Sequence, residues 1–103
     1  MQQHLIQILL PLSDNEGAPF LRSEYLRVRS ELTEQFGGLT AFTRGPAEGS
    51  WQEGGKTAHD DIVVFEVMTS EVDHKWWDRY RRSLEARFKQ DCIIIRAQEV
   101  RLL

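Results

Sequence analysis

Three charged residues interrupt segments that are otherwise rich in apolar, β-forming side chains. Glu66 follows a run of valine and phenylalanine, Arg96 follows three isoleucines, and Arg44 lies two residues after Phe42. A carboxylate and two guanidinium groups can bind an anionic or hydroxylated small molecule through charge-assisted hydrogen bonds. The same groups can instead pair with one another across neighbouring strands. Both interpretations depend on which face of a sheet these residues share.

Two aromatic residues accompany this charged set. Phe42 is expected to contact the apolar part of a ligand. Trp51 lies in the segment 45–55, which contains four glycines and one proline and is long for a hairpin loop. A tryptophan in such a loop is expected to close the mouth of a cavity, to anchor the chain against a neighbouring subunit, or to pack back on its own domain.

The remaining reactive side chains form weaker patterns. The His-Asp-Asp segment 59–61 contains possible metal ligands, but adjacent strand residues point in different directions, and His4 and His74 stand alone. We therefore expect no metal site. Cys92 is the only cysteine, which excludes an internal disulfide, and its place before three isoleucines predicts an apolar filler in a strand. No phosphate-binding or dinucleotide motif is present, so no cofactor is expected.

The elements that must position these residues follow from apolar spacing and breakers. Alternating or continuous apolar runs predict strands, and a three-to-four-residue spacing predicts helices. Gly37-Gly38 is expected to end the first helix, and the pair Ser70 and Asp73 to begin the second. The predicted elements are a strand at 4–12, a helix at 19–36, strands at 39–44 and 61–69 joined as a hairpin, a helix at 70–88 and a strand at 92–102.

This β-α-β-β-α-β order predicts an α+β, ferredoxin-like two-layer sandwich over residues 1–103 as a single domain. It should contain one antiparallel-dominated four-stranded sheet with two helices on one face. Right-handed crossovers are expected to place the first and third strands side by side and parallel.

Strand alternation then sorts residues between the two faces of the sheet. The set expected to face the helices is Ile6, Ile8, Leu10, Val63, Phe65, Val67, Ile93 and Ile95. The set expected on the opposite, open face is Leu5, Gln7, Leu9, Thr40, Phe42, Arg44, Ile62, Val64, Glu66, Met68, Ile94, Arg96 and Gln98.

The open-face set is too apolar to remain in water, so we expect a homodimer in which a second copy covers it. Two sheets packed face to face enclose a cavity. Within it, Arg44, Glu66 and Arg96 would recognise polar groups of a small organic ligand, and Phe42 and Trp51 would close the site. A purely structural cross-strand ion pair among the charged residues is the alternative.

The composition of the chain limits the classes of partner that we expect. The chain has 103 residues, 41% hydrophobic and 28% charged, with a formal net charge of −3. Without a basic field, nucleic acid is not expected as a partner. The early apolar run lacks a basic flank and a cleavage site, so neither a secretory signal nor membrane attachment is expected, and the predicted location is cytoplasmic.

The stretch Phe36-Gly37-Gly38-Leu39-Thr40, followed by Gly49-Ser50-Trp51 and then Asp60-Asp61, resembles a pattern in small uncharacterised bacterial ferredoxin-like proteins. More broadly, the strand order is similar to that of the dimeric α+β barrel proteins. These include cofactor-independent monooxygenases, muconolactone isomerase-like enzymes and stress-responsive proteins. Their catalytic residues do not map onto this chain, so the resemblance implies a fold and no catalytic residue.

Three functions from different classes follow. The leading hypothesis is a homodimer that binds a small organic molecule between its sheets. The second is a cofactor-independent isomerase or monooxygenase-like enzyme with Glu66 as general base, a role that two nearby arginines would weaken by favouring the charged carboxylate. The third is a regulatory or adaptor module that offers its open sheet face to another protein.

Overall fold

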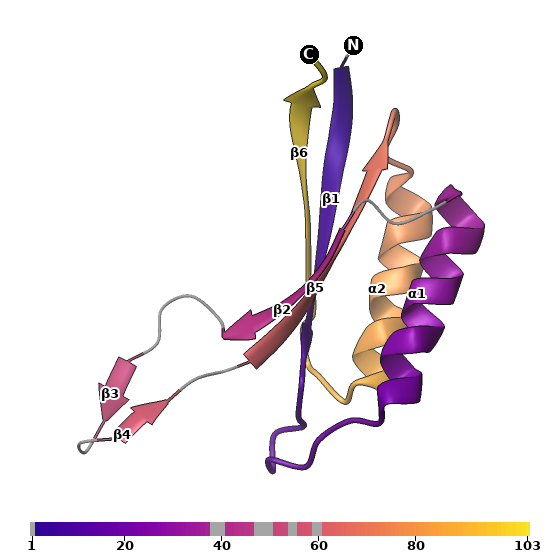
Figure 1. Cartoon of the computed structure of the whole chain (residues 1–103). Helices are drawn as coiled ribbons and strands as arrows, with labels where there is room; N and C mark the ends of the chain where they lie inside the picture. Colours follow the sequence, from indigo (N-terminus) through magenta and orange to yellow (C-terminus); the bar gives the residue numbers. More distant parts are fainter. Residues whose placement is uncertain (1, 38–40, 47–50, 54–55, 59–60) are drawn as a thin grey trace.

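The computed structural model describes residues 2–37, 41–46, 51–53, 56–58 and 61–103, and within 41–61 it describes the backbone alone. Figure 1 shows a sheet seen nearly edge-on, with two helices packed on one of its sides. The elements are β1 (Gln2–Pro11), α1 (Arg22–Phe36), β2 (Ala41–Pro46), β3 (Trp51–Glu53), β4 (Lys56–Ala58), β5 (Asp61–Thr69), α2 (His74–Arg87) and β6 (Ile94–Arg101).

The main sheet contains four strands in the order β2-β5-β1-β6. The α+β class is therefore confirmed, and the arrangement is compatible with a ferredoxin-like fold. As predicted, the first and third main strands, β1 and β5, are neighbours, but the parallel direction was wrong because they are antiparallel. The reason is that α1 returns the chain so that β2 runs with β1, and the next connection reverses it again before β5.

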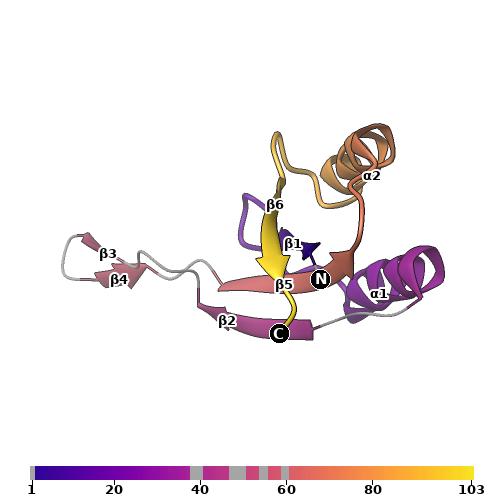
Figure 2. The same cartoon turned by 90° about the horizontal axis from the view of Figure 1, so that it is seen from above.

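The connection between β2 and β5 contains a second, two-stranded antiparallel sheet made of β3 and β4. The sequence predicted a single hairpin with an irregular glycine-rich loop here. Figures 1 and 2 show that this β3–β4 ribbon projects from the main sheet, away from both helices. Trp51 is thus the first residue of β3 and pairs with Ala58.

The helix boundaries differ from the predicted ones at their N-terminal ends. Asp73 is itself the N-cap of α2, where its carboxylate accepts a hydrogen bond from the Trp76 backbone at 3.1 Å. The Ser70 start was therefore wrong, and the cap lies one turn later. α1 begins at Arg22 because Pro19 forms a bridge with Ser13 instead of entering the helix.

At the C-terminal end of α1 the prediction is confirmed. Gly37 has a φ of 81°, and its N–H donates to the Thr33 carbonyl at 2.8 Å. This left-handed conformation is strained for any residue with a Cβ atom, which explains why a glycine follows the helix.

The core lies between the helices and one face of the sheet. Of the eight residues predicted to face the helices, seven are at most 2% exposed, and the eighth, Ile95, packs against the same cluster. These side chains meet an apolar stripe from the helices, composed of Val28, Leu32, Trp77, Tyr80, Leu84 and, just after α2, Phe88.

The two faces of the sheet therefore have different environments. Figure 2 shows α1 and α2 on the same side, and no described element covers the other side. Among the described residues, no helix combines the length and apolar character needed to cross a membrane.

Candidate functional site

A row of three polar side chains crosses the middle of the open face. Gln7 on the central strand β1 is directly opposite Glu66 on β5 and directly opposite Arg96 on β6. Residues directly opposite one another in an antiparallel pair point to the same face, so all three project from the side that the helices leave uncovered. We call Arg96, Gln7 and Glu66 the polar row.

The Gln7 amide joins the two charged groups. Its Nε2 donates to Oε2 of Glu66 at 3.0 Å, and its Oε1 accepts from Nε of Arg96 at 2.7 Å. The amide orientation is consistent with both neighbours, because the nitrogen faces the carboxylate and the oxygen faces the guanidinium. The row therefore has a positive end on β6, a neutral centre on β1 and a negative end on β5.

Both charged ends keep hydrogen-bonding capacity that the row does not use. Within the described residues, Arg96 has no hydrogen bond from Nη1 or Nη2, and Glu66 has none to Oε1. Neither residue forms an ion pair among those residues. A guanidinium fork and a carboxylate oxygen are consequently available to an additional partner.

Apolar side chains flank the polar row on both sides. Two residues along β1 in one direction, Leu9 pairs with Val64 and with Ile94. Two residues in the other direction, Leu5 pairs with Met68 and with Gln98. Leu5, Leu9, Val64 and Met68 are partly exposed, and Ile94 is 56% exposed. The open face is thus a polar stripe between apolar rows, as the alternation predicted for these three strands.

For β2, the structure gives the backbone register alone. Phe42 is paired with Phe65 and Arg44 with Val63, and Ala41 is the β2 residue opposite Glu66. The predicted placement of Phe42 and Arg44 on the open face concerns side chains outside the described ones and stays a prediction.

The side chains of Phe42, Arg44 and Trp51, three of the predicted site residues, lie outside the described ones, and so does segment 59–60. Glu66 and Arg96 remain, and the structure brings them onto one face. A direct ion pair between them, the structural alternative to a ligand site, is replaced by a bridge through Gln7, because β1 separates β5 from β6. Sequence analysis placed Gln7 on this face but missed its bridging role, which the strand order alone determines.

A second polar cluster lies between the helices. The Glu31 carboxylate on α1 accepts hydrogen bonds from the Tyr80 hydroxyl at 3.0 Å and from Nη2 of Arg87 at 2.8 Å. Burial, reinforced by the neighbouring Glu31 carboxylate, raises the pKa of Tyr80 above its ordinary range. Arg87 is only 12% exposed, and its Nε and Nη1 atoms have no partner within the described part of the chain. This cluster joins the two helices and does not reach the open face.

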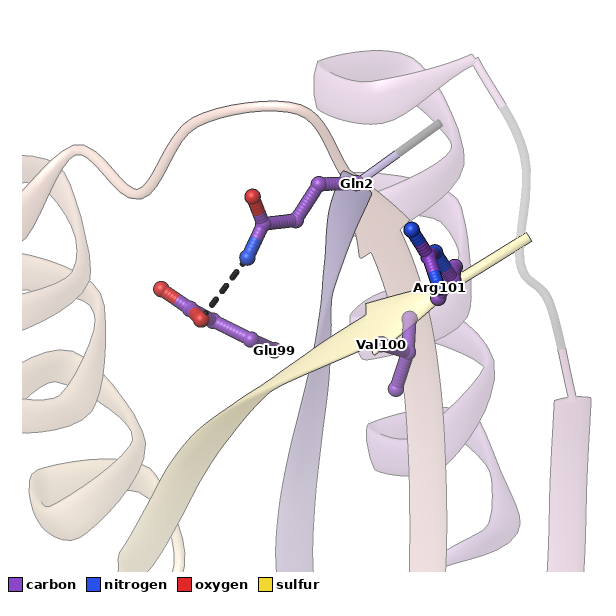
Figure 3. A pocket seen from close by; sticks show the side chains of 4 residues that line it. All are labelled: Gln2, Glu99, Val100 and Arg101. Atoms are coloured by element: carbon purple, nitrogen blue, oxygen red, sulfur yellow. Dashed lines mark hydrogen bonds between the residues drawn. The ribbon is translucent and has the colours of Figure 1, made fainter.

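A hollow of about 410 Å³ lies at one end of the sheet and is lined by Gln2, Glu99, Val100 and Arg101. Figure 3 shows the Gln2 amide directed toward the Glu99 carboxylate, to which it donates at 2.8 Å. Nε2 of His4, on the same strand, lies 3.9 Å from Glu99. Gln2 and Glu99 already bond to each other, and the polar residues of the hollow share the register of the helix-facing positions, so they are separate from the polar row.

The other reactive candidates stay isolated. Cys92 is exposed and precedes β6, so its predicted role as an apolar filler inside a strand was wrong. Across the described residues, no group of three or more histidine, cysteine, aspartate or glutamate side chains is arranged to hold a metal ion.

Comparison with known proteins gives a fold and no family. No protein-family model matches the chain, and no curated protein matches it. Among solved structures, the chain is similar to a phage SAM lyase in complex with S-methyl-5'-thioadenosine, with a TM-score of 0.63. The sequence identity is 13%, and the alignment covers 94% of this chain and 81% of the lyase. At that identity the likeness establishes a shared fold.

Proposed function

We propose that this protein is a homodimer that binds a small organic molecule against its open sheet face, with the polar row as the recognition element. The observation that carries the proposal is the polar row itself: two oppositely charged groups with unused hydrogen-bonding capacity, set between apolar rows. A ligand with an apolar body and separate acceptor and donor groups matches this pattern, because one group can accept from Arg96 and another can donate to Glu66.

Two further observations support the proposed binding of a small molecule to the open face. The apolar rows of the open face are of the kind that a partner or ligand covers in soluble proteins. The fold is also shared with an enzyme that holds S-methyl-5'-thioadenosine, a small molecule with hydroxyl groups and an apolar thioether. Trp51 remains a predicted closure of the site.

The test combines oligomeric state with ligand binding. Light scattering across a concentration series is expected to give the mass of a dimer. Calorimetric titration with S-methyl-5'-thioadenosine, and then with aromatic and lactone compounds, is expected to identify a binding class. Glu66→Gln and Arg96→Gln should each weaken that binding at least about tenfold, since each removes a charge-assisted hydrogen bond.

Matched controls are Glu34→Gln and Arg29→Gln, which make the same chemical changes at exposed positions on α1. They should leave binding unchanged. A protein that stays monomeric at every concentration would overturn the homodimer and favour the adaptor alternative, in which another protein covers the open face. Equal effects of the row variants and the controls would remove the polar row as a recognition element.

An enzyme acting at the same position is the second candidate, favoured by the fold shared with a lyase. Its test is turnover. Incubation of the purified protein with SAM, followed by chromatography for S-methyl-5'-thioadenosine, is expected to show product only if the polar row is catalytic. Product formation that Glu66→Gln abolishes, with Glu34→Gln unaffected, would replace the binding proposal by this one.

A further inference from the structure

The charged ends of the polar row lie at equal distances on either side of β1. β6 carries Arg96 on one side, and β5 carries Glu66 on the other. With neighbouring strands separated by about 4.8 Å, the two positions are roughly 10 Å apart across the sheet. The open face therefore has a charge pattern whose sign reverses from one side of β1 to the other.

Two copies can stack with their open faces together in two ways. One way places opposite charges against each other, and the other places like charges against each other. A two-fold axis that lies between the facing sheets and runs parallel to β1 exchanges the β5 side with the β6 side. Arg96 then faces the partner's Glu66, and Glu66 faces the partner's Arg96. An axis perpendicular to the strands preserves the sides, so each charge faces its own copy, and like charges face each other at an unfavourable energy.

We infer that two copies associate through their open faces about a two-fold axis parallel to β1, so that each Arg96 lies opposite the partner's Glu66. The inference rests on the proposed function in one respect, since it takes a second copy as the occupant of the open face. The groups that face each other are those that the row leaves unused: the Nη atoms of Arg96 and Oε1 of Glu66.

The apolar rows are compatible with the same axis. Leu9 lies on the central strand and so faces the partner's Leu9. Ile94 on β6 faces the partner's Val64, which matches the most exposed apolar residue of this face with another apolar one. Both contacts in this row bury apolar surface. In the row on the other side of the polar row, Leu5 faces the partner's Leu5 and Met68 faces the partner's Gln98.

The axis has a consequence for the ligand site. Each dimer contains two equivalent positions, and each position has a guanidinium from one copy and a carboxylate from the other. A hydroxyl or carboxamide group of a small molecule fits between them, because it can accept from the first and donate to the second. The site is then incomplete in a single chain, and the expected stoichiometry is two ligands for each dimer.

The test is charge reversal with rescue in trans. Arg96→Glu and Glu66→Arg, each alone, place like charges at both equivalent contacts, so each should raise the dimer dissociation constant at least about tenfold. Mixing the two variant proteins should restore association as a heterodimer. There the introduced carboxylate faces the introduced guanidinium, and the native Glu66 of one chain faces the native Arg96 of the other.

In the mixture, each variant chain still has its own altered polar row, so a defect within a chain would persist. Association that is restored on mixing therefore shows a contact between chains. Dissociation constants come from light scattering or analytical ultracentrifugation, with circular dichroism to check folding. If the wild type is a dimer and neither single variant weakens it, the axis is overturned while the proposed homodimer stands. If the wild type is a monomer throughout, the homodimer itself fails.

A cross-linking measurement covers the case in which a charge-reversal variant does not fold. In a Cys92→Ser background, Leu9→Cys places a thiol on the axis and should cross-link to its own copy through a short bismaleimide. The matched Ile94→Cys places the thiol about 10 Å to the side of its copy and should cross-link at least about fivefold less. Equal yields would overturn the axis, whereas the expected ratio supports it.

Discussion

The two faces of the main sheet differ in how deeply their side chains are buried. On the helix-facing side, alternate residues of β1 and β5 are almost completely buried among helix side chains. On the open side, the intervening residues are partly exposed, and a polar row interrupts the apolar ones. Both sets of residues belong to the same strands. The difference in burial therefore separates the residues that stabilise the fold from those that are available to a partner.

Polar groups follow the same division. Between the helices, the Tyr80 hydroxyl and Nη2 of Arg87 both donate to the Glu31 carboxylate in a largely enclosed space, where Nε and Nη1 of Arg87 have no partner among the described residues. On the open face, Arg96 and Glu66 leave part of their hydrogen-bonding capacity unused and exposed to water. Enclosed polar groups here contribute to the packing of the two helices, whereas the exposed ones are suited to recognition.

The largest expected contrast comes from adjacent residues of β5. Phe65 is fully buried, so Phe65→Ala should lower the free energy of unfolding by about 3–5 kcal/mol. Val64, on the open face, is its matched control, and Val64→Ala should cost about 1 kcal/mol or less in the monomer. Urea unfolding at low protein concentration measures both. Equal losses would show that the open face is as closely packed as the core.

A smaller effect is expected at alkaline pH from the enclosed cluster. The pKa of Tyr80 is raised in the folded state by burial and by Glu31. Above pH about 10 the unfolded chain therefore loses this proton before the folded protein does, and the stability should fall as the pH rises. Tyr80→Phe should remove this part of the alkaline loss, at a cost of about 1 kcal/mol at neutral pH for the missing hydrogen bond.

Unfolding measured from pH 8 to 11 tests this slope, and ultraviolet difference absorption follows the titration directly. Tyr80 should titrate late in the wild type. Tyr25→Phe is the matched control and should keep this late titration. A late titration of unchanged amplitude in Tyr80→Phe would contradict the assignment.

The smallest expected effect belongs to the centre of the polar row. Gln7→Ala removes both bridging hydrogen bonds, but water can replace them on an open face, so the monomer should lose less than about 1 kcal/mol. Gln98→Ala, a substitution of the same kind on the same face, is the control. Unfolding at low concentration measures the loss, and a cost comparable to that of Phe65→Ala would mean that the polar row is part of the core.

The sequence predicted the faces of three strands correctly because alternation needs only local information. Ile6, Phe65 and Ile93 were assigned to the core, and Leu9, Glu66 and Arg96 to the open face, as observed. The register of β2 was not predictable in this way. It depends on a connection that contains the β3–β4 ribbon, and a shift of one residue in register exchanges the two faces of a strand.

The candidate site was predictable in its charged groups but not in its bridge. The bond from Gln7 to both ends exists because β1 lies between β5 and β6, and strand order is a property of the whole chain. The start of β6 was likewise not predictable from local sequence. The Ile93 backbone N–H donates to the Glu85 carboxylate at 3.0 Å, the strand begins at Ile94, and Cys92 lies before it and is exposed.

The central place of β1 has a consequence for how the chain folds. This strand is synthesised before the other strands of its sheet, yet its hydrogen-bonded neighbours lie far along the sequence: Gln7 bonds to a residue 59 positions later and to another 89 positions later. Contacts of such long sequence separation slow folding, because the intervening chain must be ordered before they form. During translation β1 has no strand neighbours at first, so the sheet assembles late, after β6 has left the ribosome.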